Sequence, residues 1–318
     1  MTSNSCQGLV SRLFIKNEDD NSNDDRNLTL KLLSNPLIGS EGMGSISTLL
    51  QGSFLSKLYL SRCNIGDDGF EHLINWCTPS KNVGLQTLDI SHNGITAKGL
   101  DLFSNRLLVA EGEDKGCSLP KLTELNLSGN KFDSNSVSLL ATAIGRDHET
   151  DTNNDRRLAI TNLDLSDTSC GIDGAKAIMS QQQQQQLGGK SSLTTLSLFN
   201  NSLGLDDGFV EIASNCLIGG HPTIKSLDLG GNHANEESCV QLLKAIITAP
   251  TSSSSSNFTN QLELLILGGN EGGPNLEAMI REVQAVYPKL DIARDKPKTS
   301  QQQPDMMRMA TPQRLANE

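Results

Sequence analysis

Few residues in this sequence have types and spacing suited to chemistry. Gly188 to Ser191 read Gly-Gly-Lys-Ser, like the end of a phosphate-binding loop, whose backbone N–H groups hold phosphate at a helix N-terminus. Gln184 replaces the first glycine of that motif. The string also precedes an expected strand, whereas a phosphate-binding loop follows one. We therefore expect no nucleotide site here.

The other reactive side chains are scattered. The five His residues show no metal-binding spacing (His72, His92, His148, His221 and His233). No spacing of Ser, His and Asp suggests a nucleophile aligned with a base. The seven Cys residues include no Cys-x-x-Cys pair, which favours reduced thiols over disulfides or a zinc site. The sequence predicts no catalytic residue, no metal and no cofactor.

Composition limits the class of partner. The 318 residues carry 26 Lys and Arg against 37 Asp and Glu, a net charge of −11, whereas nucleic-acid binders usually present a basic face. No apolar run is long enough for a membrane helix, and the first residues show no secretory signal. We expect neither nucleic acid nor membrane as a partner. The expected location is the cytoplasm, with the nucleus as the alternative.

A recurring string supplies the elements that must position any site. Its form is L-x-x-L-x-L-x-x-N, and its alternating apolar residues are typical of a strand with one buried face. Clear copies begin at Leu55, Leu85, Leu122, Ile160, Leu193, Ile224 and Leu262, and Leu30, Leu32 and Asn35 fit an eighth.

Apolar residues at i, i+3 and i+7 follow most of these strings, a spacing that predicts one stripe on a helix. The sets are Met43/Ile46/Leu50, Phe70/Leu73/Cys77, Leu100/Phe103/Leu107, Val137/Leu140/Ile144, Phe209/Ile212/Cys216, Cys239/Leu242/Ile246 and Leu276/Met279/Val283. The fourth full copy has Gln182 at its third position, so its helix should end loosely. Glycine precedes the first apolar residue in five copies, as expected where a helix begins close to its neighbour (Gly42, Gly69, Gly99, Gly174 and Gly208).

One strand and one helix cannot bury their apolar faces alone, but tandem copies can bury them against each other. Parallel strands lie about 4.8 Å apart, and helices are wider, so the stack must curve. The strings and helices resemble leucine-rich repeats of the ribonuclease-inhibitor type. The resemblance implies an α/β solenoid, a horseshoe with parallel strands on the concave face and helices on the convex face.

The resemblance covers one domain of about eight repeats, residues 28–292. Residues 1–27 are expected to form an N-terminal cap, with Val10, Leu13 and Ile15 as its strand, and an acidic flexible loop. Residues 293–318 are expected to form a disordered tail, and Tyr287, Leu290 and Ile292 to cover the last helix. Four polar segments between a helix and the next strand are expected to be tolerated insertions or contact loops on one rim: 110–118, 146–157, 181–192 and 251–260.

A ladder of polar residues occupies the turn after each strand, and we expect it to be structural because leaving its buried hydrogen-bond partners unpaired is costly. Its members are Asn35, Cys63, Asn93, Asn130, Thr168, Asn201, Asn232 and Asn270. Cys63 is interpreted as a substitute within this ladder and not as a reactive thiol. Trp76 is interpreted as cover for the core.

The remaining candidate site is the concave face, where the residues between the leucines point away from the core. Its central column runs from Tyr59 to Ile266 and is small and acidic in the middle. Because Tyr and Arg are frequent interface anchors, Tyr59, Arg62 and Phe199 are the strongest single candidates. The full candidate set is Tyr59, Arg62, Asp89, His92, Asp164, Asp167, Phe199 and Asp228. The alternative is that these are ordinary strand residues of the family.

Three functional hypotheses remain open. The first is a non-enzymatic interaction module, monomeric, whose concave face and rim loops bind a protein partner with a basic surface. The second is a GTPase-activating protein resembling the Ran activators, for which Arg62 and Arg106 are the only candidates to assist phosphoryl transfer. The third is the sensing fragment of a larger receptor.

Overall fold

The structure is a computed structural model. It describes residues 28–50, 55–77, 84–108, 119, 121–145, 160–180, 192–205, 207–212, 223–248 and 262–294. The predicted capping strand at Val10, Leu13 and Ile15 lies outside these residues, as do the Gly-Gly-Lys-Ser string and the polar segments except Ser192.

Nine parallel strands form one sheet in chain order, from β1 to β9. From β2 to β9 the pairs keep one register, so that Leu88 of β3 lies opposite Leu125 of β4, which lies opposite Leu163 of β5. The β1–β2 pair shifts its register between Leu28 and Thr29. The strands are β1 (Leu28–Lys31), β2 (Leu55–Tyr59), β3 (Thr87–Asp89), β4 (Glu124–Asn126), β5 (Asn162–Asp164), β6 (Thr195–Ser197), β7 (Ser226–Asp228), β8 (Leu264–Ile266) and β9 (Asp291–Ala293).

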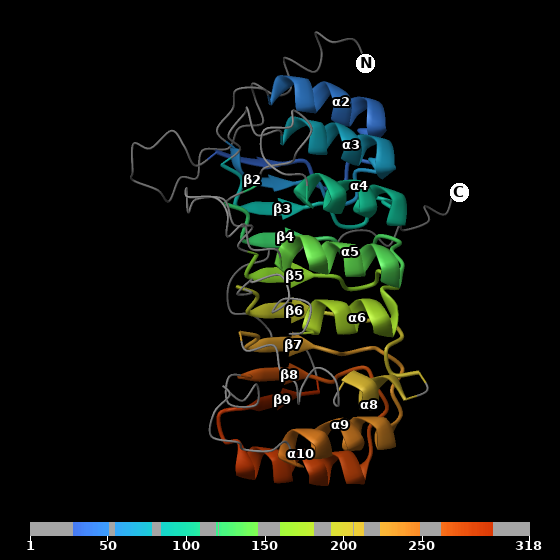
Figure 1. The fold of residues 1–318 in the computed structure, drawn as a ribbon, viewed down its shortest axis with the longest axis vertical. Helices are drawn as coiled ribbons and strands as arrows, with labels where there is room; N and C mark the ends of the chain where they lie inside the picture. Colours follow the sequence, from blue (N-terminus) through green and yellow to red (C-terminus); the bar gives the residue numbers. More distant parts are fainter. Residues whose placement is uncertain are drawn as a thin grey trace, which may run out of the picture.

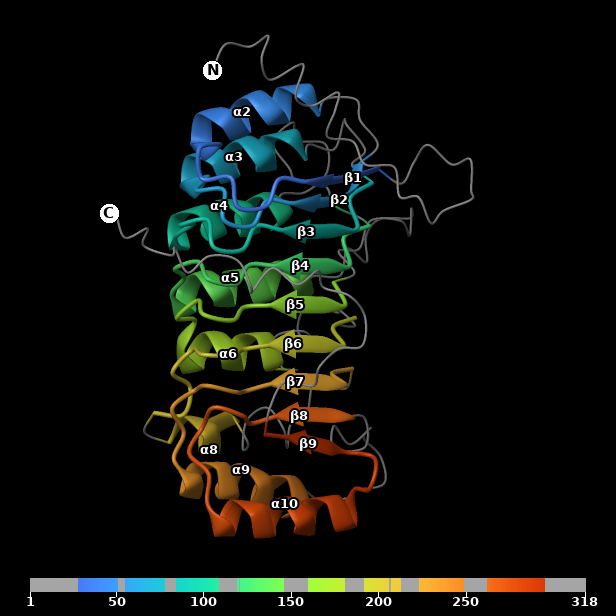
Figure 2. The same ribbon diagram turned by 180° about the vertical axis from the view of Figure 1, so that it is seen from behind.

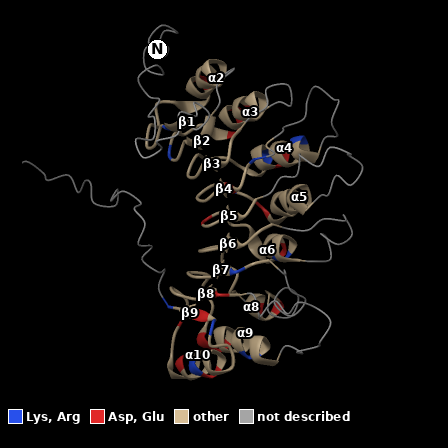
Figure 3. Ribbon diagram, turned by 90° about the vertical axis from the view of Figure 1, so that its left-hand side faces the viewer, with Lys and Arg blue, Asp and Glu red and all other residues tan. Residues whose placement is uncertain are grey.

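The helices lie in a second layer along one face of this sheet (Figures 1 and 2). They are α2 (Gly39–Leu49), α3 (Gly66–Trp76), α4 (Ala97–Leu108), α5 (Ser134–Gly145), α6 (Gly171–Met179), α8 (Gly208–Ile212), α9 (Glu236–Thr248) and α10 (Pro274–Val286). Viewed along the strands, the stack forms an arc with the strands on its inner edge and the helices on its outer edge (Figure 3). The predicted α/β horseshoe is therefore confirmed.

The core lies between the two layers and is mainly aliphatic, as expected from the low aromatic content. Leu58, Leu88, Leu125, Leu163 and Leu196 are each nearly fully buried beneath the sheet. Phe70 and Phe103 of α3 and α4 pack with ring centroids 5.4 Å apart. One continuous core therefore runs through the stacked repeats.

The helical stripes are confirmed at most positions, with departures at their ends. Leu107 and Ile144 are only half-buried. In α10 the buried residue is Ile280 and not Met279, so the middle contact falls one residue later than predicted. Cys216 and Gln182 lie outside the described residues, and α6 ends at Met179.

A ninth strand follows α10, where the repeat pattern predicts only cover for the last helix. Leu290 and Ile292 are buried and hold β9 against β8, with Ile292 opposite Leu265. Tyr287 is half-buried, and its hydroxyl donates to the carbonyl of Ile246 at 3.4 Å. The sheet thus reaches Ala293, one residue beyond the expected domain boundary.

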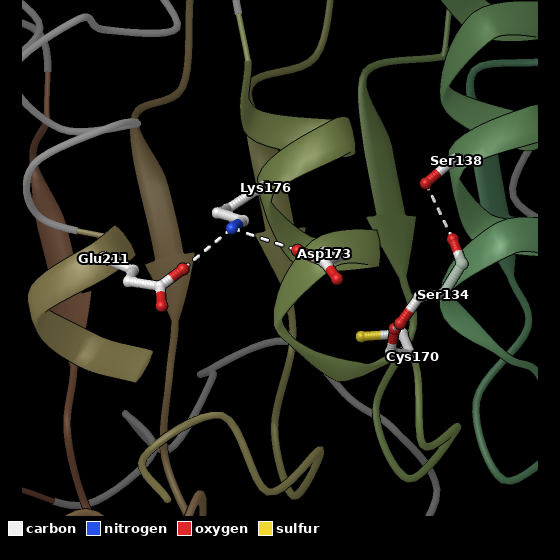
Figure 4. A network of polar contacts seen from close by, with 6 residues as sticks. All are labelled: Ser134, Ser138, Cys170, Asp173, Lys176 and Glu211. Carbon is white, nitrogen blue, oxygen red and sulfur yellow. Dashed lines mark hydrogen bonds and ion pairs between the residues drawn. The ribbon is translucent and has the colours of Figure 1, made fainter. Parts of the chain in front are cut away.

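The predicted close approach at helix starts is found at several glycines. A Cβ on Gly69 would lie 3.1 Å from Cα of Ser40 in α2, and one on Gly174 would lie 3.3 Å from Cα of Ser134 in α5. Polar contacts also join successive repeats around α5, α6 and α8 (Figure 4). Ser134 Oγ donates to the Cys170 carbonyl at 2.9 Å, and Lys176 Nζ of α6 lies 2.7 Å from Glu211 Oε2 of α8.

Candidate functional site

An asparagine ladder builds the turns at the ends of the strands. The Oδ1 atom of Asn130 accepts the backbone N–H groups of Asn93 and Ile95 in the preceding repeat, at 3.0 and 3.1 Å. Its Nδ2 donates to the carbonyls of Ile90 and Leu127. Asn93, Asn201, Asn232 and Asn270 repeat this bridging. The predicted structural role of the ladder is confirmed.

Two positions in the ladder have no amide. At the first, Cys63 Sγ donates to the carbonyl of Leu32 at 2.8 Å, which supports its predicted place in the ladder. At the second, Thr168 Oγ1 donates to Leu165 in its own repeat at 2.7 Å. Burial raises the pKa of the Cys63 thiol, which disfavours the reactive thiolate. Trp76, the predicted core cover, is 3% exposed, and its Nε1 donates to the carbonyl of Leu50.

The residue before each ladder position adopts a left-handed conformation. The φ angles at Ser34, Arg62, His92, Gly129, Asp167, Asn200, Gly231 and Gly269 run from 53° to 76°. Asn, Asp, His and Gly are the residues that best tolerate this region, which explains most of the column. Ser34 and Arg62 are the exceptions, and the exposed Arg62 side chain is held on a strained turn beside the concave face.

Several residues of the central column of the concave face have a structural role in the turns that the sequence did not predict. Asp89 Oδ1 accepts the backbone N–H of Ser91 at 3.0 Å and its hydroxyl at 2.7 Å. Asn126 makes the same two bonds to Ser128, and the Oδ1 atoms of Asp164 and Asp228 accept a backbone N–H two residues later. These side chains therefore close the turns after β3, β4, β5 and β7, with or without a charge.

The candidate residues differ in how far they are open to a partner. Arg62, His92 and Asp167 are exposed, whereas Tyr59, Asp89, Asp164 and Phe199 are half-buried. Asp228 is only 4% exposed, contrary to the expectation of an open central column. A Cβ on Gly230 would lie 3.1 Å from both Asp228 Oδ1 and Phe199 Cδ2, so the phenyl ring and the carboxylate crowd the same glycine.

A second outward column was missed, although its signal is the residue before the middle leucine of each string. Cα pairing places Lys57, Thr87, Glu124, Asn162, Thr195, Ser226, Leu264 and Asp291 in one row. Thr87 Oγ1 donates to Glu124 Oε2 at 3.1 Å. Lys31 joins the central column one strand earlier, opposite Tyr59.

Tyr59 lies between groups of opposite charge. Lys31 Nζ is 5.4 Å from the centroid of its ring, within the range of a cation–π contact. Partial burial raises the pKa of the Tyr59 hydroxyl, and the carboxylates of Glu124 and Asp89 raise it further. The hydroxyl therefore stays protonated near neutral pH and can donate a hydrogen bond to a partner.

Charge changes in strand order along the concave face. We call Lys31, Lys57 and Arg62 the cationic end, and Asp89, Glu124, Asp164 and Asp167 the anionic middle. Beyond β5 lies a third zone, where Asp228 and Ile266 are buried, Phe199 lies against Gly230 and Gly231, and Leu264 is half-buried, before Asp291 on β9. The face thus offers three chemically different zones to a bound protein.

Comparison with known protein families matches this repeat. A family model described as Leucine Rich repeat matches residues 53–73, 81–105 and 118–141, which contain β2, β3 and β4. The chain is a leucine-rich repeat protein. A search of curated proteins finds no match to the chain.

Leucine-rich repeats generally mediate protein–protein interaction. In the described part of this leucine-rich repeat protein, no group of three or more His, Cys, Asp or Glu side chains is arranged to hold a metal ion. Within the same residues, none of the helices has the length and apolar character needed to span a bilayer.

The two arginines named for GTPase activation lie on different layers of the leucine-rich repeat structure. Arg62 follows β2 at the concave face, whereas Arg106 belongs to the helix layer, where its Nη2 lies 3.4 Å from Asn75 Oδ1 of α3. Assistance to phosphoryl transfer needs charges gathered around one phosphoryl group, and these two residues do not meet.

Proposed function

We propose that this protein is a non-enzymatic interaction module that binds a protein partner with a basic surface through its concave face. The observation that carries this proposal is the anionic middle, four carboxylates on three consecutive strands and their turns. Charged surfaces that complement each other accelerate association and select partners. Asn126 shows that the turn function of this column does not need a negative charge.

Phe199 is the proposed apolar anchor of the interface. Its half-buried ring lies against the glycine backbone of the next repeat, so a partner side chain can cover it without displacing polar groups. Tyr59 and Arg62 are the proposed anchors at the opposite end of the face. In strand order, His92 lies between these two anchors and Phe199, and its ring lies next to Gly129. Asp228 is buried beneath the surface.

The finer features of the first hypothesis remain part of this proposal. They are a repeat of the ribonuclease-inhibitor-like subtype, a monomer, a cytoplasmic or nuclear location, and contacts from the rim loops. The proposed division is a cap and acidic loop at 1–27, a repeat domain at 28–292 and a tail at 293–318. The GTPase-activating alternative has no second observation in its favour and is not proposed.

The experiment neutralises the anionic middle without disturbing its turns. In the variant Asp89→Asn/Asp164→Asn/Asp167→Asn every Oδ1 acceptor is kept, as at the native Asn126 and Asn200. The control Glu41→Gln/Glu71→Gln/Glu282→Gln removes three exposed charges from α2, α3 and α10. Proteins captured by the wild type and the control but not by the variant are purified and titrated directly.

The expected result is a basic partner whose affinity falls by about threefold to a hundredfold with the variant, since three exposed charge pairs at about 0.2–1 kcal/mol each contribute about 0.6–3 kcal/mol together. Its affinity should also weaken as salt is raised. Equal affinity for the variant and the wild type, with both chains folded by circular dichroism, would remove the concave face as the binding site.

A further inference from the structure

The cationic end and the anionic middle do not neutralise each other. In the described residues, the ion pairs join Lys176 to Asp173 and Glu211, and Lys225 to Glu263, all away from the two blocks. Neutral donors serve the carboxylates instead: Thr87 Oγ1 bonds Glu124 and Ser91 Oγ bonds Asp89. Lys31 faces the Tyr59 ring. Both blocks therefore keep their net charge.

The blocks also have a fixed order and separation. β2 carries Lys57 and precedes Arg62, and β4 carries Glu124 two strands further on. Neighbouring strands lie about 4.8 Å apart, so the charges are centred about 10 Å from each other. That distance corresponds to about three residues of an extended chain.

We infer that the occupant of this face is a partner segment with its own charges in blocks, an acidic run facing Lys31, Lys57 and Arg62 and a basic run facing the anionic middle. This inference rests on the proposed function and specifies the partner. A segment that is only basic would meet repulsion at the cationic end, and like charges in contact weaken binding. The charge order therefore sets the register of the partner along the stack.

The test uses the full chain and labelled peptides of defined composition. The block peptide has a run of Glu, then Gly-Ser, then a run of Lys. The alternating peptide has the same composition with Glu and Lys interleaved, and the third peptide replaces each Glu of the block peptide by Gln. Binding is followed by fluorescence anisotropy at low ionic strength.

The block peptide is expected to bind about threefold to tenfold more tightly than the alternating peptide, the range for a few exposed charge pairs. Lys57→Glu should abolish that preference and make the Gln peptide the tighter ligand. The control Lys98→Glu makes the same charge change at an exposed residue of α4 and should leave the preference for the block peptide unchanged.

The failures of the two proposals are distinguishable. If the Gln peptide binds and loses affinity with Asp89→Asn/Asp164→Asn/Asp167→Asn, but block and alternating peptides bind equally, the charge order is wrong and the proposed function stands. Equal effects of Lys57→Glu and Lys98→Glu would also overturn the charge order. If no peptide binds, or if binding ignores the concave variant, both proposals fail.

Discussion

Asp67 of α3 holds Thr96, the residue that precedes α4 in the next repeat, by two hydrogen bonds. Its Oδ1 accepts the backbone N–H of Thr96 at 2.8 Å, and its Oδ2 accepts the Thr96 hydroxyl at 2.7 Å. Gly99 makes room for this contact, since a Cβ there would lie 2.5 Å from Asp67 Oδ1. A carboxylate in one repeat therefore fixes the position of the helix in the following repeat.

Asp67→Ala is expected to lower the free energy of unfolding by about 1–2 kcal/mol, because Thr96, the residue before α4, loses two hydrogen bonds to a carboxylate. Gly99→Ala should destabilise the protein by pushing the same carboxylate away. Urea denaturation of the two single variants and the double variant measures both losses. The losses should be less than additive, and strict additivity would show that the two residues do not act through one contact.

Asn130→Ala is expected to cost about 2–4 kcal/mol, because it leaves buried N–H and carbonyl groups of two repeats unpaired. Leu127→Ala, in the same repeat and one residue after β4, should cost about 2–5 kcal/mol by leaving a cavity. Asn162→Ala, on the exposed side of β5, is the matched control and should have little effect. Shortening the Gln181–Gln186 run should also cost little. Urea melts that rank these variants in the reverse order would contradict the assignment of the buried face.

Arg62→Gly is expected to raise stability by up to about 1 kcal/mol, because glycine adopts the φ of +59° without strain. The same variant should weaken partner binding, since it removes part of the cationic end. Arg62→Ala loses the charge but keeps the strained backbone, so it should bind as weakly without becoming more stable. Thermal unfolding and titration of both variants separate the two effects. A loss of stability with glycine would argue against strain at this turn.

Stability is expected to fall in alkaline solution as buried thiols ionise. Burial raises the pKa of Cys170 to about 12 and of Cys239 to about 11, from an ordinary value of 9.0. Below about pH 9 the thiols are protonated in both states, and the contribution is complete. Above that pH the unfolded chain releases protons first, so stability declines until the folded pKa is reached.

Cys170→Ala should reduce this alkaline decline by about 1.4 kcal/mol per pH unit, the contribution of one proton. Urea denaturation between pH 8 and about pH 10.5 provides the comparison, with Asn162→Ala as a control that keeps every thiol. Identical slopes in the variant and the wild type would show that Cys170 is not the group responsible.

The curved stack could be predicted from the sequence because the apolar residues of each repeat show which face of its strand and helix is buried. Leu125 and Leu140, for example, are separated by a turn, but each belongs to a stripe visible without coordinates. β9 was missed because Ile292, opposite Leu265, is its only apolar residue at a position of the string: Lys289 and Arg294 occupy the other two, and no asparagine closes it. β9 forms because it pairs with β8, and this contact between distant residues is not visible in the local sequence pattern.

The candidate site was harder to predict because side-chain alternation gives direction but not exposure. Asp228 points outward in sequence terms, yet Phe199 from the preceding repeat crowds the adjacent Gly230. The hydrogen bonds of Asp89 and Asn126 depend on a turn geometry that strand spacing does not contain. Lys57 and Glu124 could have been found from the residue before each middle leucine.

Thr168 leaves the link between β4 and β5 without the amide side chain that ties Asn93 to Asn130. A chain pulled from its two ends would therefore be expected to rupture first at this boundary, separating an amino-terminal block from a carboxy-terminal block. Optical tweezers would record that event as an early extension step, ahead of the release of either block. The molecule would then behave mechanically as two springs in series, with its weakest joint inside the anionic middle.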